Sequence, residues 1–292
     1  ISFLGSLFVY FKGGRFVFWV MDSSPDEAVA AGWLKKNSAA DRFLSACLRY
    51  SLSVAERVIV LDRFMRNRLL EKGVPSEKIT IIPPWAHDEV VKYDEAGRNE
   101  FRRCNNLEGK FVVMYAGNHS PCNPLDTLLL AADKLKKCTD VVFVFMGGGS
   151  EYPKVTQFAK DHCLDGVRCF PARHVSEMAG PLSAADLHVV VMGDPFVGII
   201  HPCKVYNVLT VGSSFLYIGP EASHVADIIA DSGLNNYFYA ARLGDVDAVA
   251  DFILSSRVHA GDSSGGRSEI MKVGSKYTQK ELLPKIISAI VP

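Results

Sequence analysis

Apolar runs that suit buried strands alternate with helical stripes over the first third of the chain. The run from Phe16 to Met21 has no polar break, which is typical of a strand buried on both faces of a parallel sheet. After it, Ser24 can cap a helix and Pro25 fits the first helical position. The pattern then predicts helices at residues 41–56 and 63–72 and strands at 58–61 and 79–82. Strands and helices that alternate in this way imply a parallel sheet.

Two adjacent prolines end this first series. Pro83 and Pro84 donate no amide hydrogen to a strand ladder and force an extended path. The polar stretch from His87 to about Arg98 is therefore predicted to be a linker.

A second and longer alternation follows the linker. It predicts strands at 111–115, 141–146, 167–170, 187–192, 215–218 and 237–239, and helices at 125–137, 152–161, 175–182, 202–211, 224–231 and 245–255. A doubly wound domain of this kind binds ligands beyond the carboxyl ends of its strands, so the loops there are the candidate site. Residues 261–266 are predicted to be a flexible surface turn, and helical spacing returns at 277–291.

The chain opens with an apolar run from Ser2 to Phe11. The run is shorter than the roughly 20 residues that span a bilayer, and it lacks the charged start and cleavage site of a signal peptide. A buried helix end before the first strand is the favoured interpretation, and a membrane-facing surface is the alternative.

Charge and cysteine content exclude several classes of function. The 32 basic and 32 acidic residues balance, and no lysine-arginine block occurs, so no nucleic-acid partner is expected. The 7 cysteines are scattered and never form a C-x-x-C motif. They are typical of reduced thiols in a cytoplasmic protein, and no zinc site is predicted.

A glycine loop after the predicted strand at 111–115 suits a phosphate. Gly117 has no side chain, so a phosphate could approach the backbone amides at the following helix start, where Asn118 and His119 could add donors. An ordinary strand-to-helix turn would also explain this glycine. Gly147 and Gly148 begin a weaker signal of the same kind, a triple glycine that does not match G-x-G-x-x-G.

The segment 192–207 contains the strongest candidate residue. A strand ends, a glycine-bearing loop follows, and Pro202 is placed to start a helix, so Lys204 would lie in its first turn. A cation there faces the positive end of the helix dipole, which is unfavourable unless an anion is bound. Lys204 is therefore the leading candidate for a diphosphate contact, with a solvated surface lysine as the alternative. Asn207, one turn further on, would bind a ribose hydroxyl or simply pack.

The histidines and hydroxyl residues add no further catalytic pattern. His119, His174, His188 and His201 do not share a metal-ligand spacing, and His188 is predicted to be a satisfied core residue inside a strand. No nucleophile elbow, paired-carboxylate signature or Ser-His-Asp order is found.

Taken together, these segments resemble family 4 glycosyltransferases, which are retaining enzymes of the two-Rossmann-domain fold called GT-B, and most closely the colanic-acid and O-antigen type. The landmarks in chain order are Trp19-Val20-Met21-Asp22, Ile79-Thr80-Ile81-Ile82-Pro83-Pro84, Tyr115-Ala116-Gly117-Asn118-His119, Phe145-Met146-Gly147-Gly148-Gly149, His201-Pro202-Cys203-Lys204-Val205-Tyr206-Asn207 and Tyr217-Ile218-Gly219-Pro220. Each motif is loose, but their shared order is specific.

The resemblance implies an α/β fold with two doubly wound domains, the first of them incomplete. Residues 1–90 would form part of an acceptor-side domain, and residues 91–275 a nucleotide-sugar-binding domain. Residues 276–292 would form a C-terminal helix that packs back towards the first domain.

The resemblance also implies roles for individual residues. Gly117 to His119 and Lys204 would face the diphosphate, and Asn207 the ribose. Residues 194–199 would face the donor sugar, and the strand exit at 170–173 would lie near the base. Catalytic roles would fall to Lys204, Asn207 and His119. The other implied binding residues are Asn118, Gly147, Gly148, Phe170, Arg173, Asp194, Phe196, Gly198, Ile199 and Pro202.

The sequence departs from the family pattern in two places. The family often carries two glutamates eight positions apart, whereas Ile199 and Asn207 occupy those places here. Only about 85 residues precede the linker, which is short for an intact domain of roughly 100 to 200 residues.

The expected activity is therefore transfer of a sugar from a nucleoside-diphosphate donor to a hydroxyl of a glycan or lipid-linked acceptor, with retention of configuration. Neither a metal nor a cofactor is expected, because the lysine and backbone amides could stabilise the leaving diphosphate. A catalytically inactive nucleotide-sugar-binding or assembly subunit and a sugar-nucleotide epimerase are the alternatives. We expect a cytoplasmic protein, with a peripheral contact at the inner membrane face left open.

Overall fold

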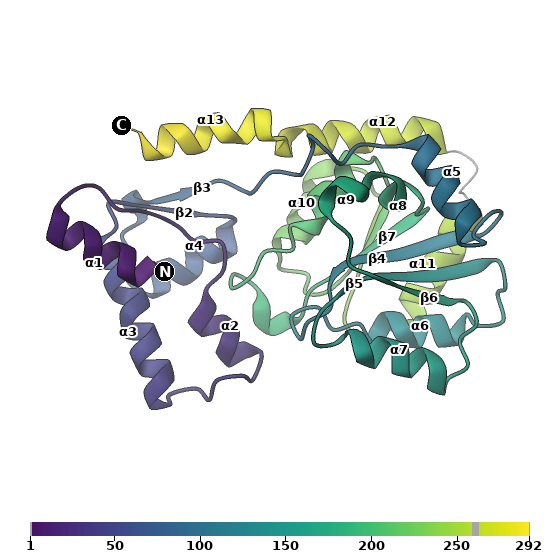
Figure 1. Ribbon diagram of the computed structural model, residues 1–292, viewed down its shortest axis with the longest axis horizontal. Helices are drawn as coiled ribbons and strands as arrows, with labels where there is room; N and C mark the ends of the chain where they lie inside the picture. The colour runs from purple at the N-terminus through teal and green to yellow at the C-terminus, as the bar shows by residue number, and fades with distance from the viewer. Residues whose placement is uncertain (1, 259–262, 292) are drawn as a thin grey trace. The chain divides into compact units, whose positions relative to one another are not determined.

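The computed structural model describes residues 2–258 and 263–291 (Figure 1). Within them the strands form two parallel sheets, one of three strands in the order β1-β2-β3 and one of six in the order β6-β5-β4-β7-β8-β9. The chain divides into two compact units. Of the described residues, the first unit contains 2–84, 195–201 and 280–291, and the second contains 85–194 and 202–279.

The first unit is built on the small sheet. Its elements are α1 (Ser2–Lys12), β1 (Val17–Trp19), α2 (Ser24–Ala30), α3 (Ala39–Val54), β2 (Arg57–Val60), α4 (Arg63–Glu71), β3 (Ile79–Ile81) and nearly all of α13 (Gln279–Ile290). The apolar run in β2 is wholly buried at Val58, Ile59 and Val60, as a central parallel strand requires. The guanidinium of Arg57 donates to the Ala289 carbonyl over 3.1 Å, which fixes α13 to this unit.

Helix α1 differs from the sequence expectation in its burial. It forms a helix and packs on α3, but its only buried residue is Ser6. Leu4, Phe8 and Phe11 keep 69%, 64% and 77% of their surface exposed. The expectation of a buried helix end is therefore wrong for these residues, because α3 covers only a narrow face of α1.

The second unit is built on the larger sheet. Its elements are α5 (Glu95–Cys104), β4 (Phe111–Asn118), α6 (Asp126–Lys134), β5 (Val141–Gly148), α7 (Tyr152–Asp161), β6 (Val167–Pro171), α8 (Ala179–Ser183), β7 (Leu187–Val191), α9 (Lys204–Thr210), β8 (Phe215–Ile218), α10 (His224–Ser232), β9 (Phe238–Ala241), α11 (Val246–Val258) and α12 (Ser263–Gly274). Short 3₁₀ turns of this unit are η2 (Val175–Glu177) and η5 (Ser275–Tyr277), whereas η1 (Ser76–Lys78) belongs to the first unit and η3 (Asp194–Phe196) begins in the second unit and ends in the first.

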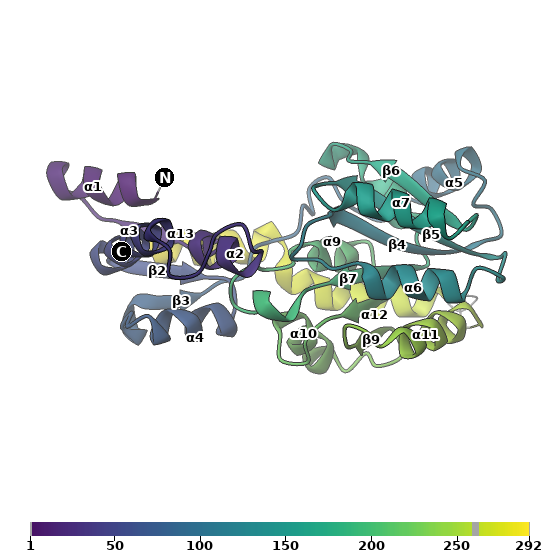
Figure 2. The same cartoon turned by 90° about the horizontal axis from the view of Figure 1, so that it is seen from below.

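Helices cover both faces of this sheet (Figure 2). Alternate residues of β4, such as Val113 and Tyr115, join α6, α7 and α11 in one core. The intervening residues, such as Val112 and Met114, join α5 and α8 in the other. This two-sided burial explains why the strands are continuous apolar runs in the sequence.

Two helices of the second unit were not expected. Helix α5 begins at Glu95 inside the predicted linker, with Asp94 accepting a hydrogen bond from the Gly97 amide over 2.9 Å. Helix α12 includes residues 263–266 of the predicted flexible turn, whereas 261 and 262 lie outside the described residues. Its two early glycines have low helix propensity, so packing decides the structure there, with Ile270 only 1% exposed.

Candidate functional site

Strands β4 and β5 approach each other closely at their carboxyl ends. Both run further than the sequence pattern predicted, so that Gly117 pairs with Gly147 and Asn118 with Gly148. A Cβ on Gly147 would lie 2.0 Å from the Gly117 carbonyl oxygen, and the residue has a φ of +143°. Glycine is thus required at 147 by the approach of two backbones rather than by a flexible turn.

The two neighbouring glycines differ from each other. Gly149 has a φ of +132°, and a Cβ on it would lie 2.3 Å from the His119 carbonyl oxygen. A Cβ on Gly148 would meet no atom within 4 Å. The glycine cluster therefore holds the 117–119 backbone in place at two positions and leaves open space at the third.

Gly117 makes room for the Lys204 side chain. It lies near the end of β4 and not at a helix start, since α6 begins only at Asp126. A Cβ at 117 would lie 3.1 Å from the Lys204 Nζ, and its φ is +153°. The sequence paired these two residues through a shared phosphate, and the structure places them in direct proximity.

The Lys204 ammonium has only neutral hydrogen-bond partners among the described residues. Its Nζ donates to the Tyr115 hydroxyl over 2.7 Å and to Asn123 Oδ1 over 3.3 Å. It also lies 4.1 Å from the centroid of the Tyr115 ring, a cation–π contact. The Tyr115 hydroxyl in turn donates to the Asn118 carbonyl over 2.6 Å.

This environment alters the acidity of Lys204. Burial without an acidic partner lowers the pKa of Lys204 to about 7, because desolvation penalises the charged form. Burial also raises the pKa of Tyr115, so that its hydroxyl stays protonated and neutral. An anionic ligand beside Lys204 would supply the counter-charge that these partners do not.

His119 is enclosed rather than presented to the site. Its side chain is 0% exposed, and its ring lies edge-on to Tyr115 and Tyr152, with centroids 5.0 Å from each. Nδ1 lies 3.0 Å from the Gly117 carbonyl, and burial lowers the pKa of His119, which favours a neutral ring. We expected the His119 side chain to donate to a phosphate. In this conformation the side chain is instead buried and packs beneath the loop.

The other predicted residues of the second unit lie on several elements. Asn207 Oδ1 accepts a hydrogen bond from the His87 amide over 3.0 Å. The exposed Arg173 lies over the Phe101 ring, which in turn contacts Phe170. Helix α9 begins at Lys204 with Cys203 as its cap, so the helix starts two residues after the predicted Pro202.

Most of the predicted donor-sugar loop belongs to the first unit. Residues 195–201 are part of that unit, whereas Asp194 ends a segment of the second. The Ser23 amide donates to the Ile199 carbonyl over 3.0 Å, and a Cβ on Gly198 would lie 2.7 Å from the Phe64 carbonyl oxygen. Phe196 and Ile199 are only 3% and 2% exposed, so these side chains are anchors of the loop.

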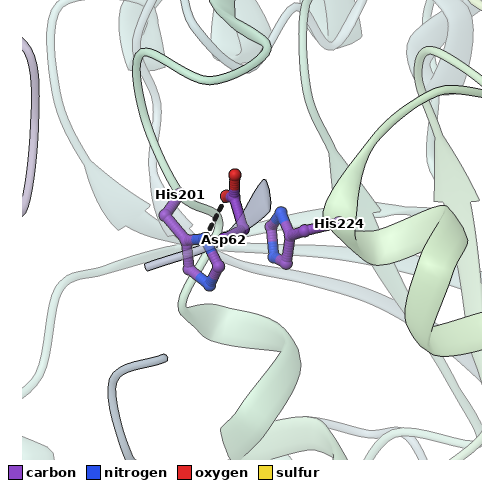
Figure 3. Close-up of side chains that lie close together, drawn as sticks. All are labelled: Asp62, His201 and His224. Carbon is purple, nitrogen blue, oxygen red and sulfur yellow. Dashed lines mark hydrogen bonds and ion pairs between the residues drawn. The ribbon is translucent and has the colours of Figure 1, made fainter. Parts of the chain in front are cut away.

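A buried polar pair fixes the end of this loop (Figure 3). His201 Nδ1 lies 2.8 Å from Asp62 Oδ2, and Asp62 Oδ1 accepts from the Met65 amide over 2.8 Å as the cap of α4. His224, also drawn there, belongs to the second unit. His188, by contrast, is the satisfied core residue that was predicted, with Nε2 2.9 Å from the Leu182 carbonyl.

Sequence reasoning missed Tyr115, Asn123 and Asp62. Tyr115 ends an apolar strand and is indistinguishable there from a core aromatic residue. Asp62 follows a strand and precedes a helix, a position that signals a helix cap and gives no hint of a distant histidine. Of the three, only Asn123 lies between the predicted strand at 111–115 and the predicted helix at 125–137, in the region that was already a candidate for phosphate binding.

The chain is similar to known glycosyltransferases. Residues 13–85 match the model of the glycosyl transferase 4-like domain. WbjE of Pseudomonas aeruginosa, named as a glycosyltransferase, is 27% identical over 253 residues, which cover 85% of this chain and 62% of WbjE. WcaI of Escherichia coli K12, named as a colanic acid biosynthesis glycosyl transferase, is 24% identical over 209 residues, 70% of this chain and 51% of WcaI. The chain thus spans between half and two thirds of the length of these relatives.

Solved structures share the fold. HepE of Anabaena, crystallised with UDP and glucose, superposes with a TM-score of 0.78 at 14% identity, covering 99% of this chain and 74% of HepE. WaaG, a glycosyltransferase involved in lipopolysaccharide biosynthesis, has a TM-score of 0.75 at 17% identity, covering 95% of this chain and 75% of WaaG.

Proposed function

We propose, from the premise that this chain belongs to the family 4 glycosyltransferases, that it transfers a sugar from a nucleoside-diphosphate donor to an acceptor hydroxyl in surface polysaccharide synthesis. The second unit binds the donor, and the diphosphate lies against Lys204 at the carboxyl ends of β4 and β5. The observation that carries the proposal is the Lys204 ammonium, held beside Gly117 by the neutral Tyr115 and Asn123.

The chemistry follows from stabilising the leaving group. The bond between the anomeric carbon and the diphosphate oxygen breaks, and negative charge develops on the diphosphate. A fixed cation in a poorly solvated place stabilises the transition state, in which this charge develops, more than it stabilises the bound donor in the ground state. The acceptor oxygen bonds to the anomeric carbon on the face that the diphosphate leaves, and the acceptor proton passes to the departing diphosphate. Configuration is thereby retained without a protein nucleophile.

We propose a uridine nucleotide as the donor carrier, which the UDP-bound HepE structure supports. Phe170 and Arg173 at the end of β6 are candidates for the base contact, since ligands of this fold lie beyond the carboxyl ends of the strands. Asn207 is the candidate for the ribose contact, because its amide nitrogen has no hydrogen-bond partner among the described residues, while its oxygen accepts from the His87 amide.

A nucleotide-sugar-binding protein without turnover is the second candidate. Two observations favour it. Ile199 is buried as an apolar residue, and the side-chain oxygen of Asn207 already accepts a hydrogen bond from the backbone. Both occupy the places that the family resemblance assigns to two glutamates. Binding without transfer would favour this candidate, and isomerised donor in the absence of an acceptor would indicate an epimerase.

Donor binding is expected to take up a proton through Lys204. With its pKa lowered to about 7, the lysine is mostly neutral at pH 8.5, and a bound diphosphate favours its charged form. Calorimetry of UDP-glucose binding in buffers of different ionisation heat should show nearly one proton taken up at about pH 8.5 and almost none at about pH 6. Affinity should fall by up to about tenfold for each pH unit above 7.

The control for this titration is Lys204→Met, which removes the titrating group and keeps an unbranched stem. It should abolish the proton uptake at pH 8.5. Tight UDP-glucose binding by the unchanged protein with no proton uptake at that pH would show that the diphosphate does not contact Lys204.

A lipid-linked acceptor would be reached at a membrane surface, and α1 is the candidate contact. No helix among the described residues is long and apolar enough to cross a membrane. Helix α1 instead exposes Leu4, Phe8 and Phe11, with Lys12 at its end. An apolar face beside a basic residue suits the interface of an anionic bilayer.

Changing both Phe8 and Phe11 to serine should weaken binding to anionic vesicles at least about one-hundredfold, because each of the two buried phenylalanines contributes roughly 1.5–3 kcal/mol. Cosedimentation with phosphatidylglycerol vesicles measures this. Phe43→Ser is the matched control, since Phe43 is a 65% exposed phenylalanine on α3. Equal cosedimentation of all three proteins would rule out α1 as the contact.

A further inference from the structure

A large cavity lies at the opposite edge of the second unit from Lys204. Its volume is about 910 Å³. It is lined by Phe111 at the start of β4, by residues that directly precede β7, β8 and β9, and by the first part of α12. Seven residue steps along β4 separate Phe111 from Asn118, about 23 Å at strand spacing. The cavity is therefore separate from the candidate donor site.

Arg267 lines this cavity and has no ion-pair partner within residues 2–258 and 263–291. Its guanidinium lies 3.5 Å from the centroid of the Tyr93 ring, and no carboxylate or hydrogen-bond acceptor contacts it among the described residues. A Cβ on Gly212 would lie 2.3 Å from Arg267 Cγ, and Gly212 has a φ of +67°. The chain thus leaves space for this arginine stem and orients its planar head on an aromatic ring.

The acid in the cavity wall is already paired. Asp186 accepts from Arg98 over 2.9 Å and from Arg102 over 2.5 Å. Two arginines against one aspartate leave the wall positive, and Arg267 adds to that charge. The electrostatics therefore favour an anionic ligand over a cationic one.

The rest of the lining offers hydroxyls and rings. The hydroxyls of Ser214, Ser256 and Tyr237 have no hydrogen-bond partner among the described residues, and all three residues line the cavity. The Tyr237 ring occupies the space beside Gly266, where a Cβ would lie 2.3 Å from the ring. Phe252 adds a second ring to the lining. Hydroxyl donors between aromatic faces suit a sugar, whose C–H faces pack on rings and whose hydroxyls exchange hydrogen bonds.

We propose that this cavity binds a sugar carrying one anionic group, a phosphate or a carboxylate, with that group on the Arg267 guanidinium. The fork of donors on arginine matches both groups in bidentate fashion. The site is independent of the donor site, so its test does not depend on the proposed transfer reaction.

The test is ligand-observed saturation-transfer NMR and calorimetry with four probes. These are glucose 6-phosphate, glucuronate, glucose and inorganic phosphate. Glucose 6-phosphate, glucuronate or both should bind at least tenfold more tightly than glucose and inorganic phosphate. Which of the two binds identifies the anionic group.

Three variants assign that binding to the cavity. Arg267→Gln keeps the stem against Gly212 and should weaken binding about ten- to one-hundredfold. Ser256→Phe removes a lining hydroxyl, places a ring in part of the cavity and should weaken binding while Arg267 is kept. Arg242→Gln, which removes an exposed surface arginine, should bind as the unchanged protein does.

Lys204→Met separates this proposal from the proposed function. It should weaken UDP-glucose binding and leave the binding of the anionic sugar unchanged. Three outcomes would overturn the cavity proposal: no anionic sugar bound at millimolar concentration, equal binding by Arg267→Gln, or inorganic phosphate alone binding as tightly as glucose 6-phosphate.

Discussion

Replacing Lys204 with alanine is expected to lower sugar transfer about one-hundredfold or more while the protein stays folded. The ammonium is held over Tyr115 and beside Gly117, where it would meet the charge that develops on the leaving diphosphate. Loss of a single preorganised donor to such a charge costs roughly 100- to 1000-fold in turnover. The measurement is the rate of UDP release and of product formation at saturating donor.

The same variant should cost little stability. The pKa of Lys204 is lowered to about 7 in the folded protein, against 10.5 ordinarily, so folding is disfavoured by the desolvated charge. The penalty is complete below pH 7 and disappears as the pH rises towards the ordinary pKa. Lys204→Ala and Lys204→Met should therefore melt at or above the temperature of the unchanged protein near neutral pH.

Lys204→Arg is an informative control for this experiment. It keeps a cation but replaces the compact ammonium beside Gly117 with a larger planar head of different hydrogen-bond geometry. It should therefore recover only part of the activity. Unchanged turnover in Lys204→Ala would remove the basis of the proposed mechanism, and product of inverted anomeric configuration by NMR would exclude retention.

Replacing Gly147 with alanine is expected to destabilise the second unit by about 3 kcal/mol or more, a loss of about 10 °C in melting temperature. The new Cβ would lie 2.0 Å from the Gly117 carbonyl oxygen, and the residue would be confined to a φ of +143°. Relief requires β4 and β5 to separate at the point where Gly117 lies beside Lys204. Donor affinity should therefore fall together with stability.

Gly148→Ala is the matched control. Its Cβ would meet no atom within 4 Å, and its φ lies outside the left-handed region. The melting temperature should then change by no more than about 2 °C. Calorimetric melting of both variants checks the pair, and equal effects would show that the close approach of β4 and β5 is not what requires glycine at 147.

The sequence was informative wherever a local pattern and a buried environment coincide. The unbroken apolar runs at β2, β4 and β5 exist because parallel strands are buried on both faces, and that burial leaves a visible pattern. Lys204 was found for a related reason. A cation in the first turn of a helix lies at the positive end of the helix dipole, which is unfavourable, and this can be recognised from the sequence alone.

Packing over long sequence distances could not be inferred in the same way. Helix α12 forms despite its glycines because Gly266 lies against the Tyr237 ring and Ile270 is buried. Helix α1 is apolar yet exposed, since burial depends on which surfaces happen to cover it. Helix propensity and apolar content are local properties, and tertiary contacts overrode both of them here.

The sequence by itself determined the α/β class, the order of the strands along the chain and the one lysine on which the proposed chemistry depends. Only the tertiary structure decided that Lys204 contacts Tyr115 and Asn123, that residues 195–201 belong to the first unit, and that Arg267 lines a cavity. The physical reason is the difference in sequence separation over which the two kinds of interaction act. Periodicity and capping act over a few residues, whereas a pKa, a buried pair or a cavity depends on groups that the chain brings together from positions 81 to 174 residues apart.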